Sequence, residues 1–266
     1  MASTLQSGSA QASVERVVEH VVGAIDRAPA LESPFHHLQL ADIFPADVYA
    51  EMMEAMPDKG DYRRMSGRAK SMPSGAGEIT RTKLDLFPEY IRHLPAEKKA
   101  VWKMVGEALC SAPVREAFRR RLAPGLEKRF GSRYREVGMY PIPILTRDVA
   151  GYRIGIHPDT RRKGMTIQLY LPRDRAIEHV GTVFHRRTGP KQYDRALQMP
   201  FAPNVGYAFA VGDDTYHSVD TVGPEVRTRD SILLTYFVDD TPVQVVHNRL
   251  KRVGNFLLNE VRSLAR

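Results

Sequence analysis

The segment Gly151-Tyr-Arg-Ile-Gly-Ile-His-Pro-Asp159 contains an apolar alternating run that leads directly into a His-x-Asp pair. Ile154 and Ile156 alternate with small or charged residues, and this period of two is typical of a β-strand. His157 and Asp159 stand two positions apart at the end of that strand, so their side chains point to the same side. A single strand end can therefore present an imidazole nitrogen and a carboxylate oxygen to one metal ion.

A second histidine completes this ligand set. His217 lies 58 residues after Asp159, beyond the apolar run 206–212 and the turn residues Asp213 and Asp214. Two histidines and one carboxylate form the facial triad of non-haem iron(II), which leaves three octahedral positions open. A structural zinc would more often have four protein ligands. The pattern predicts that His157, Asp159 and His217 bind iron and leave room for O2 and a cosubstrate.

An arginine with a nearby serine indicates how such a cosubstrate could be held. Ser231 begins the expected strand 231–238, and Arg229 lies two positions before it, so both side chains point to the same face. A guanidinium can donate two parallel hydrogen bonds to a carboxylate, and a hydroxyl can add a third. Arg227 lies on the same face and is the alternative anchor.

The expected strand 165–171 has one polar face. Thr166, Gln168 and Tyr170 alternate with apolar residues along it. Tyr170 could donate its phenol to the same carboxylate, with Thr166 nearby. The alternative interpretation is a sheet surface that faces solvent.

Length and composition favour a globular protein. The chain has 266 residues, of which 42% are hydrophobic, so it can bury a full core. We see no apolar run long enough for a membrane span and no secretory signal, so we expect a cytoplasmic location. The formal charge of +8 is spread along the chain. Because no aromatic residues alternate with the arginines at 115–121, we expect no nucleic-acid partner. The charge favours an anionic small molecule instead.

The pattern of elements changes near residue 131. We expect a disordered tail over residues 1–12, helical additions over 13–130 with a lid-like loop at 59–78, and a β-rich core over 131–266, all in one structural domain. The expected helices lie at 96–111 and 113–130. Short strands follow, separated by Gly, Pro and Asp turns, and predict an antiparallel jelly roll with helices packed around it. We expect them at 134–140, 152–156, 165–171, 181–185, 207–211 and 231–238.

These motifs resemble, in order and spacing, those of the Fe(II)/2-oxoglutarate-dependent dioxygenases, and most closely the prolyl-hydroxylase-like branch. The similarity covers about residues 134–238. Its motifs are His157-Pro-Asp159, Thr166-x-x-x-Tyr170-Leu, Gly181-Thr, His217-Ser-Val and Arg229-x-Ser231. The resemblance implies a double-stranded β-helix, the cupin-like jelly roll of that family.

The same resemblance implies the chemistry. His157, Asp159 and His217 would hold Fe(II), and Arg229, helped by Tyr170, would bind the 5-carboxylate of 2-oxoglutarate. The reaction would consume O2 and release succinate and CO2. Halogenating relatives have Gly or Ala at the position of Asp159, so the carboxylate favours hydroxylation of an unactivated C–H bond.

The substrate class remains open in the sequence. We favour a small molecule, such as an amino acid, a derivative or a natural-product intermediate. A protein side-chain hydroxylase of the prolyl-hydroxylase type is the alternative, and a non-catalytic metal-binding jelly roll is the alternative of another class. The sequence does not indicate an oligomeric state. The candidate substrate contacts are Gln168, His185, Arg153, Lys163 and Arg81.

Overall fold

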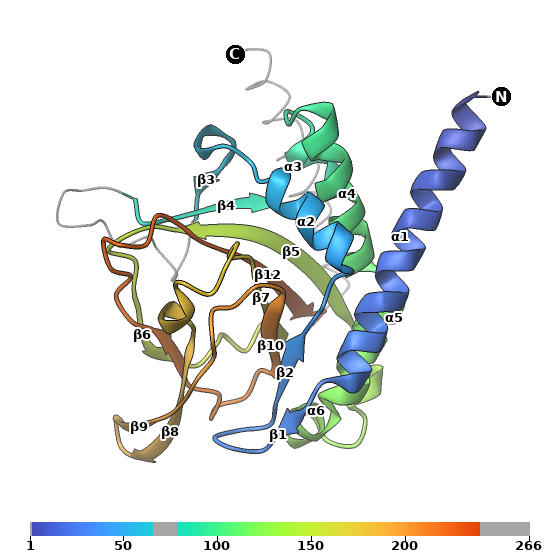
Figure 1. Cartoon of the computed structure of the whole chain (residues 1–266). Helices are drawn as coiled ribbons and strands as arrows, with labels where there is room; N and C mark the ends of the chain where they lie inside the picture. The colour runs from blue at the N-terminus through green and yellow to red at the C-terminus, as the bar shows by residue number, and fades with distance from the viewer. Residues whose placement is uncertain (1, 66–78, 240–266) are drawn as a thin grey trace.

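The computed structural model describes residues 2–65 and 79–239, and two antiparallel sheets dominate it (Figure 1). The larger sheet has the order β1-β2-β10-β7-β12-β5-β4-β3. Its strands are β1 (Ala30–Leu31), β2 (His37–Ala41), β3 (Arg63–Arg64), β4 (Arg81–Asp85), β5 (Met139–Asp148), β7 (Lys163–Tyr170), β10 (Val205–Ala210) and β12 (Arg229–Val238).

The smaller sheet faces the inner side of the larger one and has the order β6-β11-β8-β9. From β5 to β12 the chain passes back and forth between the two sheets, which is the topology of a jelly roll. The predicted fold class is therefore confirmed. The strands of the smaller sheet are β6 (Ile154–His157), β8 (Val183–Gly189), β9 (Gln192–Gln198) and β11 (His217–Val219).

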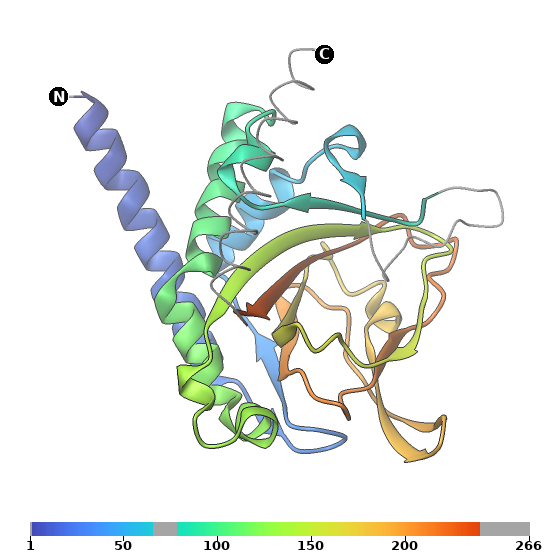
Figure 2. The same ribbon diagram turned by 180° about the vertical axis from the view of Figure 1, so that it is seen from behind.

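Helices cover the outer face of the larger sheet, as the view from behind shows (Figure 2). Trp102 is fully buried in this layer, and its indole Nε1 donates a 2.7 Å hydrogen bond to the carbonyl oxygen of Ala55. The helices are α1 (Ala2–Arg27), α2 (Ala46–Glu54), α3 (Pro88–Ile91), α4 (Ala96–Cys110), α5 (Ala112–Arg121) and α6 (Ala123–Phe130), with short 3-10 turns η1 (Lys59–Asp61), η2 (Tyr134–Glu136) and η3 (Glu178–Val180).

Strand alternation gives the larger sheet two different faces. Ile167 and Leu169 of β7 belong to the outer core under the helices. Tyr207 and Phe209 of β10 belong to a separate inner core between the sheets. Successive side chains of a strand point to opposite faces, so both cores follow from the same strands. The candidate site lies on the inner side.

The first helix differs from the expectation. Helix α1 begins at Ala2, upstream of residue 13, where we expected the helical region to begin after a disordered tail. Alanine, leucine and glutamine in this segment have good helix propensity. Gln11 also donates a 3.1 Å hydrogen bond to Glu15, one helical turn away.

Prolines explain two further differences. The helix expected over 113–130 is interrupted at Leu122 and continues as α6. Pro124 lacks the amide hydrogen that a continuous helix would need. The strand expected over 134–140 begins at Met139 and runs on to Asp148, through Pro141 and Pro143. Strand β4 pairs with β5 only over residues 144–148, so both prolines lie where β5 has a strand on one side only.

The boundary at residue 130 is not a boundary of the sheets. Strands β2 and β4 come from the expected helical additions, yet β2 pairs with β10 and β4 pairs with β5. Strand β9 was not predicted. Of the lid-like loop 59–78, residues 59–65 form η1 and β3, and residues 66–78 lie outside the described part, as do residues 240–266 of the expected core.

The arginines of α5 bind other parts of the chain. Arg119 donates hydrogen bonds to the carbonyl oxygens of Arg135 and Val137, and Arg120 forms an ion pair with Asp26. These contacts fix the helix in place. Among the described residues, no helix is both long and apolar enough to cross a membrane.

Candidate metal centre and carboxylate-binding cluster

The pairing of β6 with β11 brings the two candidate histidine ligands together. His157 lies opposite His217 in the antiparallel register, and their ring centroids are 4.5 Å apart. Paired residues of adjacent strands point to the same face, so both rings belong to one site. Two residues that are 60 positions apart in sequence are thus neighbours on adjacent strands.

Both imidazole rings are oriented by the backbone. His157 Nδ1 lies 2.8 Å from the carbonyl oxygen of Gly155, and His217 Nδ1 lies 3.0 Å from that of Thr215. A carbonyl oxygen only accepts hydrogen bonds, so each Nδ1 carries the proton. Each Nε2 is then an acceptor, which is the form that binds a metal.

Asp159 completes the cluster. Ligand atoms of His157, Asp159 and His217 all lie within 4.8 Å of one another. The Asp159 carboxylate accepts hydrogen bonds from Lys163 Nζ at 2.6 Å and from Thr166 Oγ1 at 2.7 Å. Burial alone would raise the pKa of Asp159, but the charge of Lys163 and these hydrogen bonds lower it to about 2. The carboxylate is therefore ionised.

The electrostatics of His217 also suit a metal ligand. Its burial lowers its pKa to about 4, against the opposing effect of the Asp159 charge. The ring is neutral near pH 7, as metal coordination requires. Two imidazoles and one carboxylate fit a divalent transition metal with open positions, as the sequence predicts.

The polar face of β7 connects this cluster to a second one. Thr166, Gln168 and Tyr170 are only 2%, 8% and 0% exposed, so the interpretation of a solvent-facing surface is wrong. They form a row on the inner face of the sheet, which spans roughly 13 Å at the usual rise of a strand. Thr166 binds Asp159 at one end. Tyr170 lies at the other end, beside Arg229.

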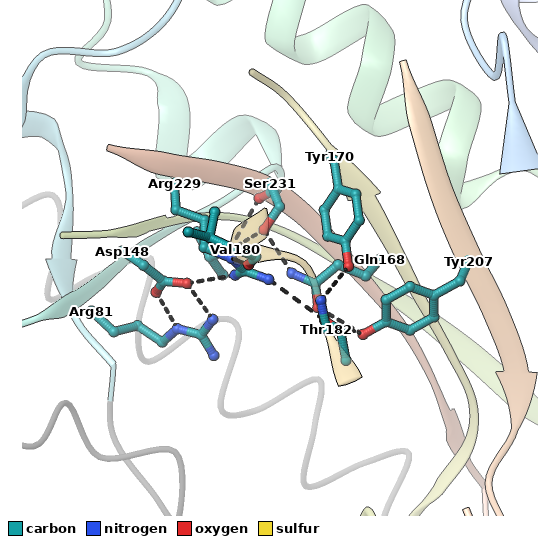
Figure 3. A network of polar contacts seen from close by, with 10 residues as sticks. Arg81, Asp148, Gln168, Tyr170, Val180, Thr182, Tyr207, Arg229 and Ser231 are labelled. Atoms are coloured by element: carbon teal, nitrogen blue, oxygen red, sulfur yellow. Dashed lines mark hydrogen bonds and ion pairs between the residues drawn. The ribbon is translucent and has the colours of Figure 1, made fainter. Parts of the chain in front are cut away.

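Arg229 is fully buried at that far end (Figure 3). Its Nε donates to the carbonyl oxygen of Val180 at 2.7 Å, and its Nη1 donates to Asp148 at 2.8 Å. Arg81 of β4 also binds Asp148, through two hydrogen bonds of 2.5 and 2.7 Å. Two buried guanidiniums thus share one carboxylate. Such an excess of positive charge in a buried site favours binding of an anion.

Hydroxyl groups surround this charge. The Tyr170 phenol oxygen accepts a 3.0 Å hydrogen bond from the Thr182 amide, and Tyr207 donates to Thr182 Oγ1 at 3.1 Å. Burial raises the pKa of Tyr170 and Tyr207, so both phenols keep their protons. Ser231 Oγ accepts from Gln168 at 2.6 Å. A guanidinium and several hydroxyl donors around one point suit a carboxylate.

Sequence reasoning missed several members of this cluster. Asp148 is the last residue of β5, which was not predicted beyond residue 140 because it contains two prolines. Tyr207 lies in an expected apolar strand, and no motif distinguishes it from a core residue. Thr182 was part of the Gly181-Thr motif, which was the only available signal for it. The alternative anchor Arg227 is exposed and lies before β12, whereas Arg229 lies in the network.

The other candidate substrate contacts are distributed differently. Lys163 and Arg81 are occupied by Asp159 and Asp148, as described above, and Gln168 is part of the buried network. His185 Nε2 contacts Ser218 Oγ at 2.8 Å, on the face of the smaller sheet opposite to the one that His217 occupies. Arg153 is exposed.

A cavity of about 850 Å³ lies beside Asp159. It lies between α6, the segment before β2 and the β10–β11 turn. Asp159 forms part of its wall. Other lining residues are Phe35, Gly125, Arg129, Thr215 and Tyr216.

Comparison with known proteins identifies the fold but no relative in sequence. The sequence matches no protein-family model and no curated protein. Among solved structures, a prolyl hydroxylase from Trichoplax adhaerens, in complex with a peptide fragment of the hypoxia-inducible factor oxygen degradation domain, superposes with a TM-score of 0.52 at 12% identity. The match covers 85% of this chain and 91% of that one. This similarity shows a common fold.

Two further solved structures are similar at lower scores. A prolyl-4-hydroxylase from Pseudomonas putida has a TM-score of 0.48 and 14% identity, over 82% of this chain and 98% of that one. An oxidoreductase of the 2OG-Fe(II) oxygenase family from Burkholderia pseudomallei has a TM-score of 0.44 and 13% identity, over 76% and 84% of the two chains.

Proposed function

We propose that this chain is an Fe(II)- and 2-oxoglutarate-dependent oxygenase of the prolyl-hydroxylase-like branch, which hydroxylates an unactivated C–H bond of a small molecule. One observation carries the proposal. The inner row of β7 joins a two-histidine, one-carboxylate cluster at Thr166 to a buried, positively charged cluster at Tyr170. A dicarboxylate that coordinates a metal at one end needs an anion site at the other.

Each group has a defined role in this proposal. His157, Asp159 and His217 would hold Fe(II), which with O2 and 2-oxoglutarate supplies the oxidation, with release of succinate and CO2. Arg229 would bind the distal carboxylate, and the protonated Tyr170 phenol would donate to it. Ser231 and Thr166 would line the space between them. Asp159 keeps a carboxylate where halogenating relatives have none, which favours hydroxylation.

The small-molecule substrate is supported by the size of the cavity. A volume of about 850 Å³ lies in the usual range of sites for small ligands. A protein side-chain hydroxylase is the second candidate, because the prolyl hydroxylase of similar fold was solved with a peptide. A metal-binding jelly roll without catalysis would retain the metal cluster alone.

The decisive experiment is anaerobic visible absorption. Metal-free protein receives Fe(II) and then 2-oxoglutarate, with His157→Ala and Arg229→Leu alongside. We expect a charge-transfer band that requires both additions, disappears in His157→Ala and needs more 2-oxoglutarate in Arg229→Leu. Absence of the band in correctly folded wild-type protein would contradict the oxygenase proposal and favour the non-catalytic metal-binding jelly roll.

A further inference from the structure

Strand β4 places a second group of charged side chains on the inner face of the larger sheet. Lys83 and Asp85 alternate with Leu84, which is buried in the outer core beneath the helices. Arg81 points inward to Asp148, so Lys83 and Asp85, at intervals of two, point inward as well. Lys83 and Asp85 therefore lie on the face of the sheet opposite to the one that the helices cover.

The group consists of two cations and one carboxylate. Arg63 of β3 lies opposite Lys83 in the register and forms an ion pair with Asp85. Lys83 Nζ lies 3.2 Å from Asp85 Oδ1. Within the described residues, the group formed by Arg63, Lys83 and Asp85 therefore has one positive charge in excess. The Arg63 guanidinium also stacks over the ring of Tyr90 at 4.4 Å, which holds it in place.

An apolar floor separates this group from the metal cluster. The register aligns Asp85 with Ile144, Ile144 with Leu233, and Leu233 with Gln168. The floor consists of Ile142, Ile144 and Leu233, all on the inner face. Ile142 and Leu233 are only half-buried, although they point inward.

The geometry sets the length of a molecule that could cover this floor. Ile142 aligns with Thr235, and Thr235 aligns with Thr166, which binds Asp159. From β7 to β4 there are three strand spacings, or roughly 14 Å. The long side chains of Lys83 and Arg63 shorten the gap. A molecule with a short hydrocarbon body would place one end near the metal and the other at the cations.

We propose that Arg63 and Lys83, oriented by Asp85, bind a carboxylate of the primary substrate, and that Ile142, Ile144 and Leu233 bind its hydrocarbon body. The inference rests on the proposed function and names its substrate class. The Arg229 cluster is fully buried and surrounded by hydroxyls, whereas the Lys83 and Arg63 side chains are 19% and 37% exposed. The two clusters thus serve a cosubstrate that is enclosed and a substrate that enters later.

The expected anion contacts support this division of roles. Arg81 and Lys163 each form an ion pair with a carboxylate of one of the two clusters described above, Arg81 with Asp148 and Lys163 with Asp159. Lys83 and Arg63 share one carboxylate between them, so the guanidinium and the ammonium both keep N–H donors for an incoming anion. Asp85 then keeps the two cations at a fixed separation.

The test uses the full chain loaded anaerobically with Fe(II) and 2-oxoglutarate. The probes are the linear carboxylates from hexanoate to dodecanoate and the matching uncharged amides, titrated while the charge-transfer band is followed, with succinate release in air as a second readout. We expect at least one carboxylate to perturb the band. The matching amide should bind at least about tenfold more weakly.

Variants identify the site. Lys83→Met and Arg63→Met should each weaken the carboxylate by about tenfold, without changing the response to the amide or the affinity for 2-oxoglutarate. Lys103→Met, an exposed lysine on α4, is the matched control and should bind as wild type. Lys83→Arg should restore most of the affinity.

Three results would overturn the subsite. These are equal binding of acids and amides, wild-type affinity in both methionine variants, and no response to any carboxylate in protein that still forms the band. Absence of the band in wild type is a different result. It would overturn the proposed function itself and with it the premise of the subsite.

Discussion

Pro158 separates the two ligands of the His-x-Asp pair and ends strand β6 at His157. A proline lacks the amide hydrogen that the next ladder position would use. Its own side chain is exposed, and the ligand atoms of His157 and Asp159 still lie within 4.8 Å of each other. At this scale, the proline releases the chain from the sheet and so lets Asp159 approach β7.

The buried neutral His217 should make the metal-free protein sensitive to acid. Its pKa falls from the ordinary 6.5 to about 4, because burial disfavours the charged ring. Between these values the unfolded chain binds a proton that the folded chain does not, so stability present above pH 6.5 is lost as the pH falls. From pH 7 to 4.5 we expect a loss of about 2 kcal/mol at this residue.

The measurement is urea denaturation of metal-free wild type and His217→Gln at both pH values. Asp159, with a pKa of about 2, stays charged throughout and does not contribute to the difference. The wild type should lose more stability than the variant. Parallel losses in the two proteins would contradict a buried neutral ring.

Among the elements, the segment between η3 and β8 positions the buried cluster around Arg229. Val180 accepts from Arg229, and Thr182 receives hydrogen bonds from Tyr207 and gives one to Tyr170. Gly181 stands between them. A Cβ at this position would come within 1.6 Å of the carbonyl oxygen of Met199, which is backbone and cannot turn aside.

We therefore expect Gly181→Ala to move this segment and to impair both folding and cosubstrate binding. Overpacking of this kind costs about 1–3 kcal/mol. Thermal unfolding and anaerobic titration of 2-oxoglutarate measure the two effects. Gly60→Ala is the control, since nothing lies within 4 Å of a Cβ there. Equal unfolding temperatures and equal 2-oxoglutarate affinities in the two variants would contradict a steric role for the contact between residue 181 and the Met199 carbonyl.

Strand β4 contributes one of the two buried guanidiniums around Asp148. Asp148→Asn should leave Arg81 and Arg229 facing each other without compensation, and such a loss costs about 3 kcal/mol. Arg81→Met leaves a neutral Asp148–Arg229 pair, so its cost should be smaller. Urea denaturation of both variants gives the order. The reverse order would mean that Asp148 is not the shared counterion.

At the scale of the whole molecule, the larger sheet separates two cores with different tasks. The outer core, under the helices, contains Trp102 and the outward residues of β7 and β12. The inner core contains Phe209, whose ring lies 5.3 Å from that of His217, and Phe184, which lies opposite His217 in the strand register. The two cores lie on opposite faces of the sheet, so a change of packing in one core affects the other through the backbone of the strands between them.

The helical layer should therefore support the fold without tuning the site. Trp102→Phe removes the hydrogen bond to the Ala55 carbonyl and leaves that oxygen buried, which costs about 2 kcal/mol. The midpoint of urea unfolding should fall accordingly. The affinities for Fe(II) and 2-oxoglutarate should not change, and a large change in either would show that the two cores are coupled.

Local patterns in the sequence predicted the jelly roll, which the structure confirms, and indicated the metal cluster and Arg229 as an anchor, whose roles stay predictions. Strand period, turn residues and the His-x-Asp spacing are properties of neighbouring residues, so they can be read along the chain. The start of helix α1 and the extent of the proline-containing β5 were not predicted, because their local signals were weak or contradictory.

Donor type and strand alternation are local properties, so candidate residues for binding a metal and an anion can be predicted along the chain. Their combination depends on strand pairing and packing between distant segments. Asp148, Arg81 and Arg229 lie on three strands far apart in sequence, and their shared charge exists only because β4 and β12 both pair with β5. Likewise, burial turned the polar face of β7 into an interior row, since burial depends on what packs opposite a strand and not on the strand itself.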